Sequence, residues 1–206
     1  AQGAGCCGAV RFHLNHPAAG LDDMRALIDA WWPMIERGEV EAIVMTASGC
    51  GSTVREYGHF LAQDAGYAQK AGRIAAMTRD LSEVVAAEGA RLEFAQPAAA
   101  ARIAFHSPCS LQHGQQVQGA AEMLLTRAGY ELAPVPDGHL CCGSAGTYSI
   151  LQPELSQRLR DNKLAALQSG GPEGIATANI GCLAHLAGGT ATPVRHWIEL
   201  IEARLG

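Results

Sequence analysis

The sequence predicts an α/β protein built from two pseudo-repeated units, each a small parallel sheet flanked by helices. Short apolar runs that suit strands alternate with longer segments of helical periodicity, an order typical of parallel sheets with crossover helices. A cysteine pair followed by glycine also occurs twice, as Cys6-Cys7-Gly8 and as Cys141-Cys142-Gly143. A further cysteine follows each pair, Cys50 after 43 positions and Cys182 after 40.

The repeat divides the chain near the alanine-rich stretch 96–101. The first cysteine-rich unit then covers residues 1–95, and the second covers residues 96–206. The second unit holds one more cysteine, Cys109, which lies 32 positions before Cys141. Its counterpart in the first unit would fall before residue 1, so we expect the first unit to be truncated at its N-terminus.

The elements expected in the second unit follow from its breakers and its apolar periodicity. Ser107-Pro108, Gly129 and the turn at 170–172 interrupt the pattern, and the short apolar runs between such breakers indicate strands. Apolar residues spaced by three or four positions indicate helices. In chain order we expect a strand over 102–105, a helix over 115–128, a strand over 130–135, a helix over 153–167, a strand over 174–178 and a final helix over 193–205.

The first unit follows the same order with fewer elements. The apolar run at 42–47 precedes Cys50 as the run at 174–178 precedes Cys182, and both indicate strands. Helical periodicity occupies most of the remaining length. We expect a helix over 21–36, a strand over 42–47, a helix over 53–65 and a further helix over 70–88.

The cysteines of the second unit all lie just after an expected strand. The strands of a parallel sheet end at one edge, and ligands bind in the loops at that edge. Cys109, Cys141-Cys142 and Cys182 are therefore expected to converge there, although they are far apart in the sequence. Cys6-Cys7 and Cys50 take matching places, before the expected helices of the first unit.

Composition and charge exclude several functional classes. The 206 residues are 48% hydrophobic and 17% charged, which excludes disorder, and no run of 18 apolar residues predicts a membrane-spanning helix. A net charge of −5 and 5% aromatic residues are unlike a nucleic-acid-binding protein, so we expect no nucleic-acid partner. The chain begins at Ala1 without a charged start or an apolar segment, so we expect an intracellular fragment or a processed product.

Seven cysteines in this arrangement indicate metal or redox chemistry rather than a disulfide framework. Adjacent cysteines have Cα atoms about 3.8 Å apart, closer than the roughly 4.4–6.8 Å of a relaxed disulfide. Structural zinc usually takes a close C-x₂₋₄-C pair, and dithiol redox sites take C-x-x-C; the sequence has neither. An iron–sulfur cluster accepts thiolates from several directions, adjacent ones included. We favour a cluster and keep zinc, dithiol redox chemistry and free thiols as alternatives.

The cysteine motifs resemble those of the tandem CCG cysteine-rich domain. This domain occurs in heterodisulfide reductase B-type subunits, lactate-utilisation proteins and glycolate oxidase iron–sulfur subunits, and the similarity is closest to the last of these. It covers essentially all 206 residues. The stretches that carry it are Gly5-Cys6-Cys7-Gly8-Ala9, Ala47-Ser48-Gly49-Cys50-Gly51, Leu140-Cys141-Cys142-Gly143-Ser144, Asn179-Ile180-Gly181-Cys182 and Pro193-Val194-Arg195-His196-Trp197.

The resemblance implies the C-terminal half of an iron–sulfur subunit. In such a complex an FAD-containing subunit oxidises glycolate or a related 2-hydroxy acid, and an iron–sulfur cluster, of the 4Fe-4S type, relays electrons towards quinone. The implied location is the cytoplasm, or the inner face of the membrane through association with the complex. Two alternatives are a catalytic CCG-type reductase or lactate-utilisation protein, and a zinc-stabilised module that docks other subunits without a redox role.

The resemblance also implies the site residues. Cys109, Cys141, Cys142 and Cys182 would hold the cluster or metal, with His185 as a further ligand or as a hydrogen-bonded neighbour. The fuller family pattern ends in C-x-x-C, whereas this sequence has Thr53 and His185 at the last position of each unit.

Residues outside that set receive weaker interpretations. Cys6, Cys7 and Cys50 form a second site, which the missing cysteines would leave incomplete. His106 and His113 flank Cys109; they either tune the cluster or, as loop histidines commonly do, lie in solvent.

We expect no catalytic residue in this chain. No Ser–His–Asp set, paired carboxylates or dinucleotide fingerprint stands out in the sequence. Oxidation of a 2-hydroxy acid removes two electrons together, normally as a hydride to a flavin or nicotinamide. We therefore expect the isolated chain to be inactive on glycolate and to need a flavoprotein partner.

Overall fold

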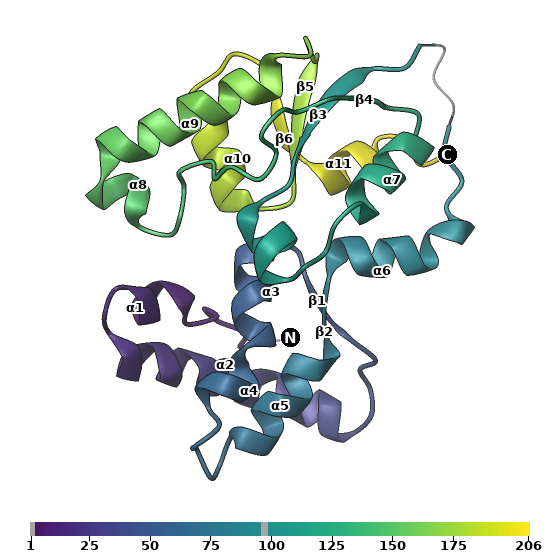
Figure 1. Ribbon diagram of the computed structural model, residues 1–206. Helices are drawn as coiled ribbons and strands as arrows, with labels where there is room; N and C mark the ends of the chain where they lie inside the picture. The colour runs from purple at the N-terminus through teal and green to yellow at the C-terminus, as the bar shows by residue number, and fades with distance from the viewer. Residues whose placement is uncertain (1–2, 96–98) are drawn as a thin grey trace. The chain divides into compact units, whose positions relative to one another are not determined.

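A computed structural model of the chain describes residues 3–95 and 99–206 and shows the expected α/β architecture. The chain forms two compact units, Ala1–Leu81 and Ser82–Gly206. Each unit contains parallel strands flanked by helices, two strands in the first unit and four in the second, as far as the described residues go (Figure 1).

The second unit is built on a parallel sheet with the strand order β4-β3-β5-β6. Strands β3 and β5 occupy its centre and carry apolar residues on both faces, so Ala104 and Ala176 are completely buried. The bounds of the strands are β3 (Arg102–His106), β4 (Glu131–Ala133), β5 (Gly174–Thr177) and β6 (Val194–His196).

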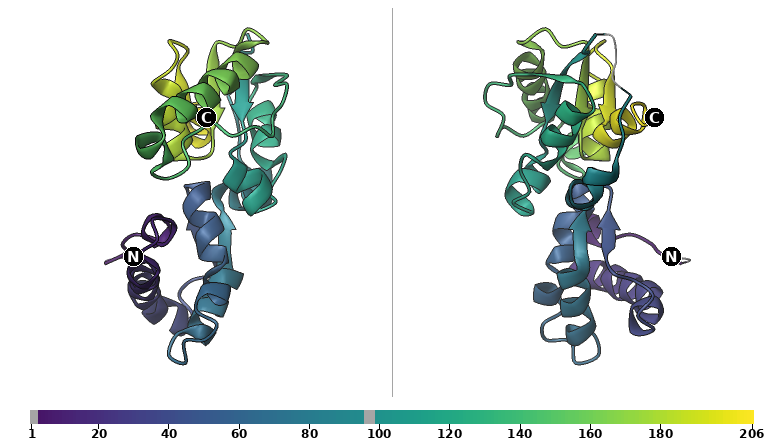
Figure 2. Two further views of the ribbon diagram at one scale, coloured as in Figure 1. Left: turned by 60° about the vertical axis from the view of Figure 1, so that its left-hand side comes forward. Right: turned by 90° about the vertical axis from the view of Figure 1, so that its right-hand side faces the viewer.

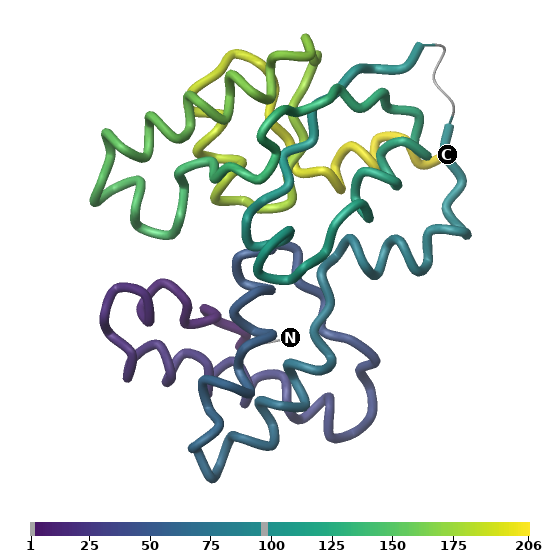
Figure 3. Tube along the Cα trace, viewed as in Figure 1, coloured from purple at the N-terminus to yellow at the C-terminus, as the bar shows by residue number. Residues whose placement is uncertain are grey.

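Helices cover both faces of this sheet. In Figure 1, α9 and α10 lie on one face, and α7 and α11 lie on the other. The trace in Figure 3 shows that the chain passes through a helix between each pair of successive strands. The bounds of the helices are α6 (Leu81–Glu88), η1 (Gly89–Arg91), η2 (Ser110–Gly114), α7 (Ala120–Arg127), α8 (Tyr148–Leu151), α9 (Pro153–Gln168), α10 (Ile180–Ala187) and α11 (Trp197–Glu202).

The first unit has a smaller sheet and a helical core. Strands β1 and β2 are parallel, and α3 lies against β2 (Figure 2). Met24, Ile28 and Ile74 are completely buried in the core of this unit. The bounds of its elements are α1 (Ala9–His13), α2 (Pro17–Glu36), β1 (Ile43–Met45), α3 (Ser48–Arg55), α4 (Tyr57–Phe60), α5 (Ala68–Met77) and β2 (Thr78–Asp80).

The sequence repeat corresponds to a repeat in structure. Ile43 of β1 pairs with Thr78 of β2, and Ile175 of β5 pairs with Val194 of β6. In each unit a cysteine lies seven positions after the isoleucine, in the first turn of the next helix. The prediction of two repeated CCG units is confirmed.

Two expected helices are wrong in part, because each contains a strand. The helix expected over 70–88 is α5, β2 and α6, and the helix expected over 193–205 is β6 followed by α11. Both strands are three residues long and carry no apolar alternation, so pairing with β1 or β5 decides their conformation.

Several expected helix boundaries also move. The helix expected over 115–128 begins only at Ala120, because Gly119 before it takes a left-handed conformation, with φ at 78°. The helix expected over 21–36 begins earlier, at Pro17, where proline suits the first turn. The helix expected over 53–65 is α3 and α4, which together begin at Ser48.

The structural division of the chain falls before the boundary expected at 95/96. Residues 82–95 contact the second unit, since Arg127 donates to the carbonyl of Gly89 at 2.9 Å and Ala95 donates to that of Arg204 at 2.8 Å. Part of the alanine-rich stretch on which the expected boundary was based, residues 96–98, lies outside the described residues.

Candidate metal centre

The four cysteines of the second unit lie at the carboxyl edge of its sheet. Cys109 follows β3, Cys141 and Cys142 lie in the connection from β4 to α8, and Cys182 lies in the first turn of α10, directly after β5. The expected location of these cysteines at the strand ends is therefore confirmed.

The side chains of these cysteines form one continuous set. The Sγ atoms of Cys142 and Cys182 are 3.0 Å apart. Cys141 forms side-chain hydrogen bonds with Cys109 on one side and with Cys142 on the other. All four are free thiols; Cys142 and Cys182 are buried, and Cys109 is exposed. The fold thus brings together thiols from three separate segments of the chain.

The hydrogen bonds between the thiols divide them into donors and acceptors. Hydrogen bonds from Cys109 and Cys142 lower the pKa of Cys141, and a hydrogen bond from Cys142 lowers the pKa of Cys182. The same bonds raise the pKa of Cys109 and Cys142, which give the protons. These bonds favour the thiolate at Cys141 and Cys182, and the thiolate is the form that binds metals.

The glycine of the CCG motif lets the cysteine loop approach a helix closely. Gly143 has φ at +87°, and a Cβ on it would lie 2.3 Å from the carbonyl oxygen of Ser156 in α9. The hydroxyl of Ser156 in turn donates to the carbonyl of Gly143 at 2.7 Å. Gly8 of the first unit repeats this geometry, with φ at +84° and a Cβ position 2.4 Å from the carbonyl oxygen of Gly20. Only glycine combines a positive φ with the absence of a Cβ, and both positions require this combination.

His106 belongs to the thiol cluster, although a solvated position is the commoner one for a loop histidine and was favoured by the sequence. The ligand atoms of His106, Cys142 and Cys182 all lie within 4.8 Å of one another, and the three residues are buried. Its Nδ1 is 2.8 Å from the hydroxyl of Thr177 on β5. Burial lowers the pKa of His106 to about 3, and the charge of Lys163 adds to this. The imidazole is therefore neutral at pH 7, which is the form that binds metals.

Two further polar groups near the thiols were missed by the sequence analysis. Asn179 donates from Nδ2 to Sγ of Cys182 at 3.5 Å. Lys163 is 1% exposed, and its ammonium donates to the carbonyls of Gly138 and Asp137 at 2.8 and 3.3 Å. A lysine this deeply buried is uncommon, and its helix offers a sequence signal: Lys163 lies seven positions after Ser156 and four before Leu167, on the buried face of α9.

His185 lies beside the CCG loop and contacts Ser156. Its Nε2 is 3.1 Å from the hydroxyl and 3.3 Å from the carbonyl oxygen of Ser156. In the described part of the chain, the group of side chains able to share one ion does not include His185. Of the two roles expected from the sequence, its position favours the hydrogen-bonded neighbour. His113 lies in η2, the short helix that follows Cys109.

The first unit brings together Cys6, Cys7 and Cys50. Cys7 is buried and gives a hydrogen bond to Cys50, which lowers the pKa of Cys50 to about 7 and raises that of Cys7. The hydroxyl of Tyr57 donates to the carbonyl of Cys7 at 2.9 Å. Thr53, in the place of the missing cysteine, donates to the carbonyl of Gly49 at 3.3 Å, within its own helix. This set offers three thiols against four in the second unit.

The donor set of the second unit fits an iron–sulfur cluster and also fits a zinc ion. Four thiols converge from three segments of the chain, two of them from adjacent residues, and this suits a cluster whose irons face different directions. The buried group of His106, Cys142 and Cys182 offers the nitrogen and sulfur donors that zinc takes.

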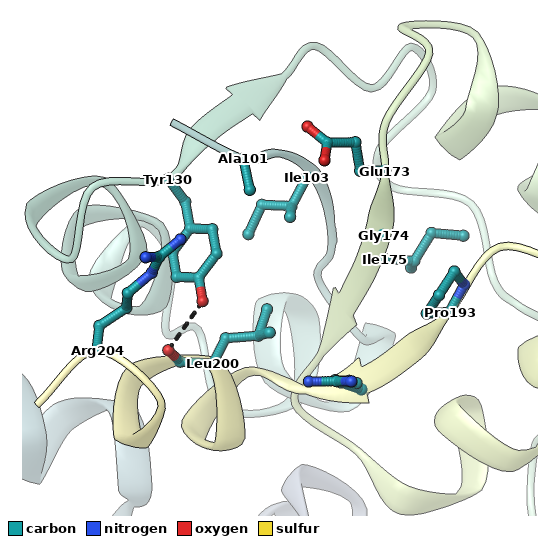
Figure 4. Close-up of a pocket in the computed structure, with 10 residues that line it drawn as sticks. Ala101, Ile103, Tyr130, Glu173, Gly174, Ile175, Pro193, Leu200 and Arg204 are labelled. Atoms are coloured by element: carbon teal, nitrogen blue, oxygen red, sulfur yellow. Dashed lines mark hydrogen bonds between the residues drawn. The ribbon is translucent and has the colours of Figure 1, made fainter. Parts of the chain in front are cut away.

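A pocket of about 250 Å³ lies at the opposite edge of the sheet. Its lining residues come from the beginnings of strands β3, β5 and β6, and Tyr130 donates there to the carbonyl of Leu200 (Figure 4). No cysteine or histidine lines it. The pocket is therefore separate from the thiols, which follow the ends of the strands.

These features define a class of protein, in which repeated α/β units gather cysteines at the carboxyl edge of a parallel sheet. The CCG family, a cysteine-rich domain, matches residues 1–55 and 103–187. The chain belongs to this family. The resemblance found from the cysteine motifs is confirmed.

The sequence is similar to three proteins of named function. The chain is 53% identical over 205 residues to the glycolate oxidase iron-sulfur subunit of Escherichia coli (strain K12), covering 100% of this chain and 50% of the relative. It is 30% identical over 183 residues to the probable glycolate oxidase iron-sulfur subunit of Bacillus subtilis (strain 168), covering 86% and 39%. It is 25% identical over 205 residues to lactate utilization protein A of Geobacillus kaustophilus (strain HTA426), covering 97% and 83%. The chain thus spans half or less of the two glycolate oxidase relatives.

Proposed function

We propose that the second unit holds an iron–sulfur cluster and that the chain is an electron-relay part of a glycolate or related 2-hydroxy acid oxidase complex. The observation that carries this proposal is the continuous set of four thiols, with Cys142 and Cys182 3.0 Å apart. The names of the two glycolate oxidase relatives support the iron–sulfur assignment and the complex.

Cys109, Cys141, Cys142 and Cys182 would hold the cluster, for which we propose the 4Fe-4S type. When bound, it supplies one-electron transfer at a potential that the protein tunes. The chain's own groups prepare the site: the amide of Gly143 donates to Sγ of Cys141 at 3.3 Å, and Asn179 donates to Sγ of Cys182. These donors favour the thiolate forms. Exposed Cys109 leaves one side of the set open to a partner.

The partner that this function requires is a flavoprotein. Removal of two electrons from a 2-hydroxy acid takes a hydride acceptor, and an FAD-containing subunit supplies one, whereas the thiol set accepts no hydride. The electrons would continue towards quinone. The chain would then act in the cytoplasm or at the inner face of the membrane. Within the described residues, no helix has the length and hydropathy needed to cross a bilayer.

Two assays test the proposal. After anaerobic reconstitution with iron and sulfide, the chain should be brown and contain both elements, and Cys142→Ser should lose most of the iron. Cys6→Ser, an exposed cysteine of the first unit, is the matched control and should keep the iron of the second unit. Full iron and sulfide in Cys142→Ser would refute the ligand assignment.

The second assay concerns the isolated chain. Purified protein, with or without added flavin, should not reduce a dye in the presence of glycolate, because its sequence shows no dinucleotide fingerprint at which a flavin or nicotinamide would bind to accept the hydride. Dye reduction that depends on glycolate would refute the relay function. Activity restored by a flavoprotein subunit would support it.

Two other functions have a specific observation in their favour. Lactate utilization protein A matches over 83% of its length, which keeps a catalytic reductase or lactate-utilisation role as the alternative. The buried group of His106, Cys142 and Cys182 favours a zinc-stabilised docking module. Colourless protein with one zinc ion and no sulfide would identify the zinc module.

A further inference from the structure

Lys163 is a cation buried in the second unit, next to the connection that carries the cysteine pair. It lies on α9, is 1% exposed and directs its ammonium to the connection that carries Cys141 and Cys142. Its two hydrogen-bond partners, the carbonyls of Gly138 and Asp137, are neutral groups. The side-chain carboxylate that interacts with it belongs to Asp137, which is exposed and therefore screened by water.

Inside the protein, the ionisable groups that interact with the ammonium of Lys163 include three cysteines of the thiol set. Cys142, Cys141 and Cys182 each interact electrostatically with the ammonium and oppose the lowering of the Lys163 pKa by burial. Lys163 acts on the thiols in turn: its positive charge helps to lower the pKa of Cys182. At His106 the same charge acts against protonation of the ring. Lys163 is thus within electrostatic range of three of the four cysteines and of the histidine beside them.

We infer that Lys163 is a positioning residue that sets the reduction potential of the cluster by placing one fixed, buried positive charge beside its cysteine ligands. The inference rests on the proposed iron–sulfur function. A reduced cluster carries one negative charge more than the oxidised cluster, so a nearby cation stabilises the reduced form and raises the potential. The effect is stronger here than for a surface charge, because a buried charge is screened much less than an exposed one.

A simpler role for Lys163 is to tether the loop. The carbonyl of Gly138 also accepts a hydrogen bond from Gln112 at 3.2 Å, and Gln112 donates to the carbonyl of Ser107 at 2.9 Å. These bonds connect the segment before Cys109 to the segment before Cys141. A tether needs only a hydrogen-bond donor at position 163, whereas a change of potential needs the charge.

Two variants separate these roles. Lys163→Gln removes the charge and keeps a donor, and Lys163→Met removes both. Arg158→Gln is the matched control, since it loses the same charge from an exposed position of the same helix. The full chain is reconstituted anaerobically, its iron and sulfide are measured, and its potential is determined by a redox titration followed by electron paramagnetic resonance.

We expect both Lys163 variants to have a more negative potential than the unmodified chain, at equal iron content for Lys163→Gln. Most of the difference should persist in 1 M KCl, because added salt screens a buried charge much less than an exposed one. Arg158→Gln should keep the original potential. Should Lys163→Met fail to fold, Lys163→Gln alone still decides the matter.

The outcomes that contradict the inference differ from those that contradict the proposed function. An unchanged potential in Lys163→Gln, with a cluster present in both proteins, would leave Lys163 as a tether only. A reconstituted unmodified chain without iron and sulfide would refute the iron–sulfur function, and the inference with it.

Discussion

Replacement of Gly143 by alanine tests the geometry that positions the cysteine pair. The backbone of Gly143 is left-handed, with φ at +87°, and its Cβ position lies 2.3 Å from the carbonyl oxygen of Ser156 and 3.1 Å from Cβ of Leu159. A methyl group there forces either the cysteine loop or α9 to move. We therefore expect Gly143→Ala to destabilise the second unit and to lower its metal content.

The size of the effect follows from two contributions. An alanine in the left-handed region costs about 1–2 kcal/mol. Steric overpacking against a fixed backbone carbonyl costs about 1–3 kcal/mol more. The expected loss is therefore roughly 2–5 kcal/mol, before a gain of about 0.4–1 kcal/mol from the lower entropy of the unfolded chain.

Gly146→Ala is the matched control, since it removes a glycine from the same loop. Gly146 also has a positive φ, +59°, but its Cβ position has no atom within 4 Å. This variant should be destabilised only by the cost of the left-handed backbone, about 1–2 kcal/mol. The same gain from the lower entropy of the unfolded chain applies to it. The difference between the two variants isolates the contact with Ser156.

Hydrogen exchange followed by mass spectrometry measures the free energy of unfolding for each unit separately. Gly143→Ala should lose protection in α9 and in the central strands β3 and β5, while the peptides of the first unit keep theirs. Equal protection in Gly143→Ala and Gly146→Ala would mean that the contact with Ser156 does not hold the loop, and the explanation of the CCG glycine would be wrong.

Two further substitutions test the hydrogen bonds around the thiols. Tyr57→Phe should destabilise the first unit by about 1–3 kcal/mol, because it leaves the carbonyl of Cys7 without the hydroxyl that donates to it. Chemical denaturation measures this loss, and Tyr67→Phe, whose hydroxyl contacts exposed Asp29, should change the stability less; equal effects would contradict the prediction. His185→Gln should keep the iron content and the reduction potential of the reconstituted chain, because Nε2 of His185 contacts Ser156 rather than the thiols. Loss of iron from this variant would identify His185 as a ligand.

The convergence of the cysteines could be predicted from the sequence because it depends on local rules. Apolar runs such as residues 102–105 and 174–178 bury both faces of a strand, and their alternation with amphipathic helices leads to a parallel sheet. The ends of its strands share one edge, so Cys109 and Cys182 meet there, although they are 73 positions apart.

The two short strands β2 and β6 could not be predicted in this way. Thr78–Asp80 and Val194–His196 have no apolar alternation, and their neighbours in sequence are helical. Each becomes a strand because a longer apolar strand, β1 or β5, offers it a row of hydrogen-bond partners. Long-range pairing of this kind outweighs local propensity.

The sequence by itself determined the α/β class, the repeat and the edge of the sheet at which the thiols gather, since these depend on periodicity and spacing along the chain. Only the tertiary structure decided which polar groups surround the thiols. His106 ends a strand and Lys163 lies in the middle of a helix, and both are buried because the sheet and α9 exclude water from them. The environment of a buried charge depends on the groups that other segments place around it, and no local pattern in the sequence specifies those groups.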